Sequence, residues 1–301
     1  MYPISNLTST ATIAGASRVS PLTPNREAEA LAFLAERPAH TFGMAGWIRE
    51  NGILSPHNRG TFFASRNEMG QLDGIAMIGH NTMFEARSDG ALKGFAKIAL
   101  SCPNVFRVLG EWDKVERFTE FLTNHGRTVR LECREHLFEK RWPVEILDPV
   151  PGLRLANPSD LDLIAPVHAQ MAFEDSGVNP LEVDPVGFRQ RCARRIHKGK
   201  TWVWLQDGRL MFKADLVSDT PEVIYLEGIW VNPADRGKGY GQRCLSQLVR
   251  EFLNRAPSVI LLVNKDFERA LNFYQKAGFK LVAYYDTVYI DSVTRSLGSR
   301  V

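Results

Sequence analysis

A strand-like run that leads through a glycine-rich turn into an amphipathic helix constrains the fold of this chain more than any other feature. Residues Val223–Gly241 read VIYLEGIWVNPADRGKGYG, and a helix is predicted directly after them, over Gly239–Asn254. The free N–H groups in the first turn of a helix, together with its macrodipole, favour a bound anion. Glycines in the turn let a phosphate approach the main chain where a Cβ would intrude. The segment predicts an α/β fold with a mixed sheet and a phosphate-binding loop.

The spacing within the loop Arg236–Gly241 argues against two common nucleotide sites. The run RGKGYG lacks the Gly-Lys-Ser/Thr of the Walker motif, and its glycines do not have the G-x-G-x-x-G spacing of the Rossmann motif. A glycine-softened turn without a ligand would explain the loop if it stood alone.

Two motifs together resemble the signatures of the GNAT superfamily of N-acetyltransferases. The first is Arg/Gln-x-x-Gly-x-Gly/Ala after a strand that ends in V-x-P, present here as Val231-Asn232-Pro233 followed by Arg236, Gly239 and Gly241. The second is Tyr-x-x-x-Gly-Phe, present as Tyr274–Phe279 at the usual separation. The resemblance covers Leu153–Ile290. It implies a GNAT fold in the C-terminal half, and an enzyme that transfers an acetyl group from acetyl-CoA to a primary amine.

The resemblance also implies which residues hold the co-substrate. In GNAT enzymes the loop binds the CoA pyrophosphate through main-chain amides, and the preceding strand, usually bulged, pairs with the pantetheine arm. Many members carry an asparagine seven residues before the tyrosine, where this chain has Phe267. That contact is therefore open, and Asn264 at the end of the preceding strand is a nearby amide. The implied cofactor-binding residues are Ile229, Trp230, Val231, Arg236, Gly237, Lys238, Gly239, Tyr240, Gly241 and Asn264.

Two residues are candidates for the proton transfers of the reaction. The resemblance implies that Tyr274 protonates the departing thiolate, a role for which a phenol is suited; the alternative is an ordinary core tyrosine. Glu227 lies on the strand that should line the site, and its neighbours face the other way if it faces the cleft. A carboxylate in an apolar strand needs a reason, and a raised pKa would suit a general base. The alternative is an ion pair between Glu227 and a nearby arginine.

The acceptor site is expected at the connection between the first two helices of this half. That connection, Phe173–Pro185, contains Glu174 and Asp175 and no basic residue. An acidic rim would attract a cationic amine, whether a small molecule or an amine of a peptide or protein; a solvated loop is the alternative. Just beyond, Arg189–Lys200 carries six Lys/Arg and no acid. It could meet an acidic substrate or the 3′-phosphate of CoA, or form an exposed helix face.

A proline-rich stretch at 142–152 predicts a linker between two domains, at 1–148 and 149–301. The order of elements before it, which includes single strands over Gly60–Arg66 and Gly74–Phe84 and an optional edge strand over Thr12–Val19, repeats the order after it. The N-terminal half therefore resembles a degenerate GNAT-like domain, as in two-domain bacterial proteins. The equivalent loop, Arg87–Leu92, contains an aspartate that would repel pyrophosphate. This half would support the other, complete its cleft or mediate a homodimer.

Bulk composition narrows the remaining classes. A net charge of +3 does not indicate a partner nucleic acid. No apolar run approaches the ~20 residues that span a membrane, and a secretory signal is not recognisable, so a cytoplasmic location is expected. The four cysteines lie far apart, without metal-ligand spacing, so reduced thiols, no metal and direct attack in a ternary complex are expected. The alternative function is a non-catalytic acyl-CoA sensor.

Overall fold

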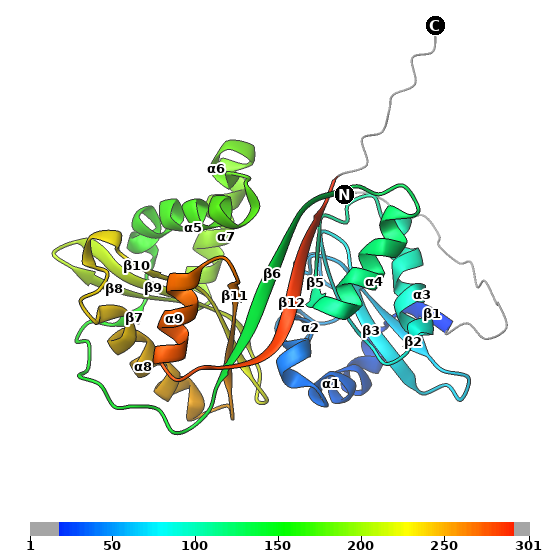
Figure 1. Cartoon of the computed structure of the whole chain (residues 1–301), viewed down its shortest axis with the longest axis horizontal. Helices are drawn as coiled ribbons and strands as arrows, with labels where there is room; N and C mark the ends of the chain where they lie inside the picture. Colours follow the sequence, from blue (N-terminus) through cyan, green and yellow to red (C-terminus); the bar gives the residue numbers. More distant parts are fainter. Residues whose placement is uncertain (1–17, 292–301) are drawn as a thin grey trace, which may run out of the picture.

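One mixed sheet runs through the whole molecule (Figure 1). The structure, a computed structural model, describes residues 18–291. In this part of the chain the sheet has twelve strands in the order β1-β2-β3-β4-β5-β12-β6-β11-β10-β9-β8-β7. The strands are β1 (Arg18–Pro21), β2 (Thr61–Arg66), β3 (Leu72–Ile78), β4 (Asn81–Ala86), β5 (Arg107–Glu111), β6 (Val129–Lys140), β7 (Arg154–Leu155), β8 (Thr201–Gln206), β9 (Arg209–Asp219), β10 (Ile224–Val231), β11 (Val259–Asn264) and β12 (Lys280–Ile290).

The helices follow the predicted order within a few residues, and the mixed α/β fold is confirmed. Helix α7 has the predicted bounds because Pro185 starts it and the Asp184 side chain accepts a hydrogen bond from the Gly187 amide. The helices are α1 (Glu27–Ala35), α2 (Pro38–Asn51), α3 (Asp89–Leu100), α4 (Trp112–Thr123), α5 (Leu161–Ser176), α6 (Pro180–Val183), α7 (Pro185–His197), α8 (Tyr240–Leu253) and α9 (Glu268–Lys276), with short 3-10 turns η1 (Pro24–Arg26), η2 (Pro158–Asp160) and η3 (Pro233–Asp235).

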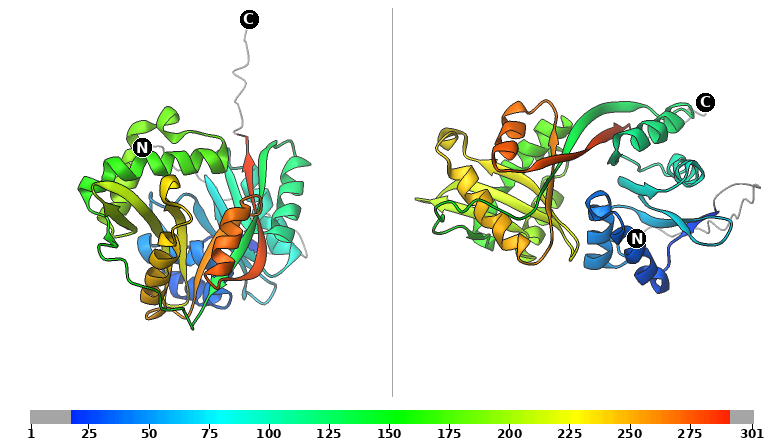
Figure 2. Two further views of the ribbon diagram at one scale, coloured as in Figure 1. Left: turned by 60° about the vertical axis from the view of Figure 1, so that its left-hand side comes forward. Right: turned by 60° about the horizontal axis from the view of Figure 1, so that its bottom comes forward.

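The last strand of each half is inserted into the sheet of the other half. In sequence β6 ends the N-terminal half, yet it pairs with β11 on one side and with β12 on the other. Strand β12 ends the C-terminal half, yet it pairs with β5. Figure 2 shows these two long strands joining the two lobes. The domain bounds stay a sequence prediction, but the two halves share one sheet and each is completed by the other.

Helix α2 of the N-terminal half packs on strands of the C-terminal half. The Phe42 ring lies 4.2 Å from that of Tyr225 on β10, centroid to centroid. The Ser218 hydroxyl of β9 donates a 2.7 Å hydrogen bond to the Phe42 carbonyl. Gly46 is needed here, because a Cβ would collide with the Ser218 side chain. This packing joins α2 of one half to β9 and β10 of the other.

Two sequence predictions about elements need correction. The strand predicted over Gly74–Phe84 is a hairpin, β3 and β4, that turns at Gly79 and His80. Both of its strands are largely buried, and only Gly79 and His80 separate them, so the apolar stretches on either side concealed the short turn. The acidic connection after α5 contains the short helix α6, which was not predicted. The optional edge strand predicted over Thr12–Val19 overlaps β1 at Arg18 and Val19. Its residues 12–17 lie outside the described part of the chain.

Candidate active site

The glycine-rich loop leaves a row of main-chain donors free at the start of α8. Gly237 and Gly239 have φ of 81° and 80°, a conformation that side chains with a Cβ rarely adopt. Among the described residues, no hydrogen bond engages the N–H groups of residues 237–242. Gly241 has a different role, because a Cβ there would lie 2.8 Å from Val231 and 3.2 Å from Phe273. The loop therefore presents an exposed anion site on a closely packed helix start.

The basic side chains of the loop are partly engaged by the protein itself. Lys238 donates to the buried Asp235 at 2.8 Å, and Arg209 lies 2.9 Å from the same carboxylate. Arg236 Nε donates to the Val231 carbonyl at 3.2 Å. These contacts hold the loop in shape, so the free main-chain amides carry most of its attraction for an anion.

Strands β10 and β11 separate directly in front of this loop. They pair in parallel only at Ile224–Val259 and Tyr225–Ile260, so the remainder of β10 has a free main-chain edge on that side. Strand β10 has a bulge between Glu227 and Trp230, as expected for the strand before the loop. Gly228 lies within this bulge and has φ of 61°.

A buried charged network supports the bulge, and the sequence analysis did not identify it. Lys213 on β9 donates to the Gly228 carbonyl at 2.8 Å and forms an ion pair with Asp215, both side chains being fully buried. Asp215 also accepts from Thr201 at 2.7 Å, and its other oxygen lies 2.8 Å from His168 Nε2 and 3.5 Å from Arg195. Burial alone would raise the pKa of Asp215, but Lys213, His168 and Arg195 outweigh burial and hold that pKa well below its usual range.

A cavity of about 170 Å³ lies where the two strands separate. Both halves of the molecule contribute to it through the exchanged strands. Its lining consists of Arg107 (β5), Cys133 and Glu135 (β6), Met171 and Asp175 (α5), Tyr225, Glu227, Gly228 and Ile229 (β10), Leu262, Val263 and Asn264 (β11), Phe267, Ala270 and Tyr274 (α9 and its start), and Thr287 and Tyr289 (β12).

Three carboxyl groups meet at this cavity. Glu227 is exposed and has no ion pair within 4 Å among residues 18–291, which argues against the structural alternative for it. Glu135 accepts a hydrogen bond from the Thr287 hydroxyl, and burial raises its pKa. Asp175 is exposed as a whole residue, but burial of its carboxyl group, with Glu227 and Glu135 nearby, raises its pKa to about 7. Asp175 can therefore exchange a proton near neutral pH.

Three tyrosines enclose the cavity with hydroxyl groups that no other described residue engages. Tyr225, Tyr274 and Tyr289 are all buried, and none of their hydroxyls forms a hydrogen bond within the described chain. Burial raises the pKa of Tyr274, so its phenol keeps its proton at neutral pH. Tyr274 therefore lies, with its proton, at the same cavity as the carboxyl groups.

The other predicted residues divide between the cavity and its surroundings. Asn264 lines the cavity, while its side chain also accepts from the Asp266 amide at 2.9 Å. Trp230 packs on a separate apolar cluster, and Tyr240 packs against Trp204. Glu174 does not line the cavity and accepts instead from Gln170 at 3.0 Å.

The basic segment Arg189–Lys200 links elements of the fold. Lys198 and Lys200 both pair with Glu50 of α2, at 2.5 and 2.9 Å, and so connect the two halves. Its arginines contact residues of other elements as well: Arg189 pairs with Asp162, Arg191 with Asp184, Arg194 with His57 and Arg195 with Asp215.

The thiols in the site are poor nucleophiles. Cys133 lines the cavity, and burial together with the carboxylates of Glu135 and Asp175 raises its pKa. Burial raises the pKa of Cys244 to about 12. A thiol that resists ionisation does not readily form an acyl intermediate. Among the described residues, no group of His, Cys, Asp and Glu could hold a metal ion.

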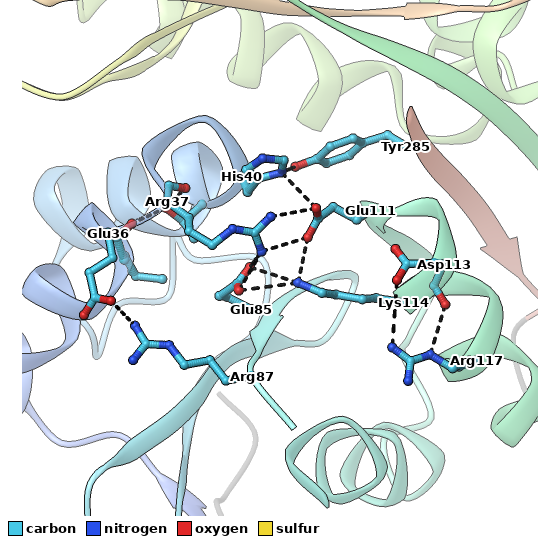
Figure 3. A network of polar contacts seen from close by, with 12 residues as sticks. Glu36, Arg37, His40, Glu85, Arg87, Glu111, Asp113, Lys114, Arg117 and Tyr285 are labelled. Carbon is cyan, nitrogen blue, oxygen red and sulfur yellow. Dashed lines mark hydrogen bonds and ion pairs between the residues drawn. The ribbon is translucent and has the colours of Figure 1, made fainter. Parts of the chain in front are cut away.

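In the N-terminal half, ion pairs occupy the corresponding gap between parallel strands. Strands β4 and β5 pair up to Met83–Leu109 and then separate. Arg37 bridges Glu85 and Glu111 across the separation at 2.8 and 2.7 Å, and Lys114 lies 2.6 Å from Glu111 (Figure 3). Although burial works against ionisation, these cations lower the pKa of Glu111 to about 2. Arg37 and Lys114 thus fill the place that stays open in the C-terminal half.

The loop of the N-terminal half differs accordingly. Only Arg87 and Ser88 separate β4 from α3, and the Ser88 hydroxyl caps the helix by accepting from the Ala91 amide. Asp89 pairs with Arg117. Since the main-chain donors that bind phosphate in the other half are here shortened and capped, this half has the architecture without the anion site.

A sheet that splays next to a helix start occurs in both halves, open in the C-terminal half and closed by ion pairs in the N-terminal half, so the chain has a tandem fold. Residues 169–279 match the acetyltransferase (GNAT) family. Comparison of the amino-acid sequence with curated proteins finds no match. The matched region lies in the C-terminal half, where the two motifs predicted a GNAT domain.

Solved structures of low sequence identity share this fold over nearly the whole chain. A tandem GNAT protein from the clavulanic acid biosynthesis pathway is 12% identical, with a TM-score of 0.57 over 93% of this chain and 99% of its own. A Drosophila protein is 14% identical, with a TM-score of 0.66 over 92% and 100%. A GCN5-related N-acetyltransferase from Sphaerobacter thermophilus is 12% identical, with a TM-score of 0.57 over 92% and 96%. Within residues 18–291, no helix is both long and apolar enough to cross a membrane.

Proposed function

We propose that this protein is an acetyl-CoA-dependent N-acetyltransferase that acylates a primary amine by direct attack in a ternary complex. The observation that carries the proposal is a cavity at which a bulged strand with a free edge, a protonated phenol and three carboxyl groups meet, in the half whose glycine-rich loop leaves its main-chain donors free. The degenerate half has the corresponding strands, but ion pairs fill the gap between them. It therefore acts as a support that supplies β6 and a β5 side chain to the site.

The residues present fit acetyl-CoA as the co-substrate. The free amides of residues 237–242 and the positive-φ glycines suit a pyrophosphate, and the unpaired edge of β10 from Ile229 to Val231 suits the amides of a pantetheine arm. When bound, acetyl-CoA supplies the acetyl group as a thioester. The nitrogen of the amine then forms a bond to the acetyl carbon while the carbon–sulfur bond breaks.

The side chains of the cavity carry the protons of this transfer. Glu227 takes the ammonium proton, and Asp175, exposed at the end of α5, passes it to solvent. As the new bond forms, the nitrogen gives up a second proton to Glu227, which balances the proton that Tyr274 donates to the departing sulfur. One proton is released overall. The thiols contribute no covalent step, because Cys133 remains protonated.

Replacement of Tyr274 by phenylalanine tests the function directly. We expect the kcat for CoA-thiol release with an amine panel to fall about tenfold to a hundredfold, because a thiolate leaves with some ease even without a proton donor. The affinity for acetyl-CoA, measured by calorimetry, should change less than about threefold. Wild-type protein that binds acetyl-CoA tightly but turns over no amine or peptide would contradict the proposal and favour an acyl-CoA sensor.

The pH dependence follows from the raised pKa of Asp175. Below pH 7 this carboxyl group is protonated and cannot relay a proton, so we expect kcat/KM to fall about tenfold per unit as the pH drops below 7. Because neighbouring carboxyl groups share protons, this acidic limb of the plot of kcat/KM against pH reflects the whole group of carboxyls and not Asp175 alone. In Asp175→Asn the limb should move to lower pH, whereas in Glu174→Gln it should stay. Two acceptors with different amine pKa values separate the enzyme's limb from that of the amine; an unchanged limb in Asp175→Asn would refute the relay.

A further inference from the structure

The cavity contains one cation with no partner of its own. Arg107, on β5 of the N-terminal half, is the only basic residue among the described residues that line it. Its Nε is closed off from solvent and has no hydrogen-bond partner, and no described carboxylate lies within 4 Å of the guanidinium. A buried N–H donor of a charged group that has no partner costs free energy. Such a group points to an anionic ligand atom that completes the site when the acceptor is bound.

The protein's own carboxylates surround Arg107 without engaging it. Burial alone would lower the pKa of Arg107, but the acidic groups around it, among them Glu135 and Glu227, outweigh burial and raise that pKa, so Arg107 stays charged. Glu135 is instead bound to Thr287, and Glu227 is free to meet the acceptor. Burial, together with the charges of Arg191 and Arg107, lowers the pKa of Arg59, so Arg107 has other guanidinium groups in its neighbourhood. His80 adds no charge, because burial and these arginines lower its pKa to about 4, which leaves the imidazole neutral.

Both signs of charge therefore line one small cavity. At about 170 Å³ it is smaller than the ~300–1,000 Å³ of sites for drug-sized ligands. A simple amine would satisfy the carboxylates and leave Arg107 unpaired, and a polyamine would bring a second cation towards it. A ligand with an ammonium group at one end and a carboxylate at the other satisfies both sides.

We propose that the acceptor is a small amino acid, whose carboxylate binds Arg107 while its amine faces Glu227 and Asp175. This inference rests on the proposed function for the transfer itself. Planar, two-pronged recognition of a carboxylate is the contact for which a guanidinium is best suited. The residue comes from the degenerate half, so that half selects the acceptor while the other half binds the co-substrate.

The test compares amino acids with their primary amides and with the amines that lack the carboxylate. With wild-type protein and acetyl-CoA, we expect kcat/KM for the best amino acid to exceed that for its amide by about 10- to 100-fold, as for one charge-assisted contact. In Arg107→Gln this ratio should fall to near one, through loss of activity on the amino acid and not on the amide. Arg117→Gln, which removes a surface guanidinium paired with Asp89, should keep the wild-type ratio.

Binding gives a second readout that does not depend on turnover. Calorimetry with the same amino acid in the presence of CoA should show binding to wild type and a loss of at least tenfold in Arg107→Gln. If that variant does not fold, Arg107→Lys can replace it. Lysine keeps the positive charge but not the two-pronged guanidinium, so the ratio of kcat/KM for the amino acid to that for its amide should be intermediate.

The outcomes separate the two proposals. Equal activity on amino acids and amides, unchanged by Arg107→Gln, overturns the amino-acid acceptor and leaves the transferase intact. Binding of an amino acid that depends on Arg107, without transfer to any amine, supports the ligand and overturns the transferase. A protein that binds neither amino acid nor acetyl-CoA overturns both.

Discussion

Replacement of Lys213 by methionine is expected to lower the free energy of unfolding by about 3–5 kcal/mol, the range for breaking one partner out of a buried ion pair. Methionine fills a similar volume, so the loss comes from the charge. Lys213 and Asp215 are both fully buried. In the variant, His168 and Arg195 are the basic side chains that remain next to the buried Asp215 carboxylate. The Gly228 carbonyl also loses its donor. Urea unfolding followed by circular dichroism measures the effect.

Two companion variants show whether burial is the cause. Lys265 and Asp266 form an exposed pair, so Lys265→Met should change stability by no more than about 0.5 kcal/mol. Lys213→Met/Asp215→Asn should be more stable than Lys213→Met alone, because the unbalanced charge is gone. Since Lys213 holds the bulge, we expect weaker acetyl-CoA binding in the single variant even under conditions where it is folded. A loss below 1 kcal/mol would show that the network is not structural.

Local patterns were sufficient to predict most elements and one half of the site. Helix α4 and helix α7 have their predicted bounds, because an amphipathic stripe and a proline at the start are local signals. The glycine loop and Tyr274 were found because their spacing is a motif, and the structure brings them to neighbouring elements. Glu227 was found because a carboxylate in an apolar strand stands out.

The other half of the site depends on strand pairing over long distances in sequence. A pattern shows that residues 129–140 form a strand, but not that this strand lies between β11 and β12. Arg107 and Glu135 reach the cavity only through that exchange, so no local signal identified them as site residues. A signal for the support network was present: Lys213 and Asp215 interrupt an otherwise apolar strand, RLMFKADLVSD, much as Glu227 interrupts its own. Paired charges at alternate positions of a buried strand predict a buried network.

Glu227→Gln is expected to lower kcat by about 10²- to 10⁴-fold, the usual contribution of a general base, with little loss of stability. Glutamine has the same shape and can still form hydrogen bonds, but it cannot take a proton from the ammonium group. Glu227 is exposed at the cavity and has no ion pair within 4 Å among the described residues, so its replacement leaves no buried cation behind. Thiol release at saturating amine, together with urea unfolding, measures both quantities.

The duplicated fold supplies a matched control. Glu85 follows the last parallel pair of β4 and β5 by two residues, as Glu227 follows that of β10 and β11. Glu85 is buried and paired with Arg37 and Lys114, so Glu85→Gln should cost about 1–3 kcal/mol of stability and leave kcat within twofold. The reverse pattern, in which Glu85→Gln abolishes turnover or Glu227→Gln mainly unfolds the protein, would refute these assignments. Because the two glutamates share a place in the fold and differ in their surroundings, the crossed result would show that the open, unpaired environment of Glu227 confers its chemistry.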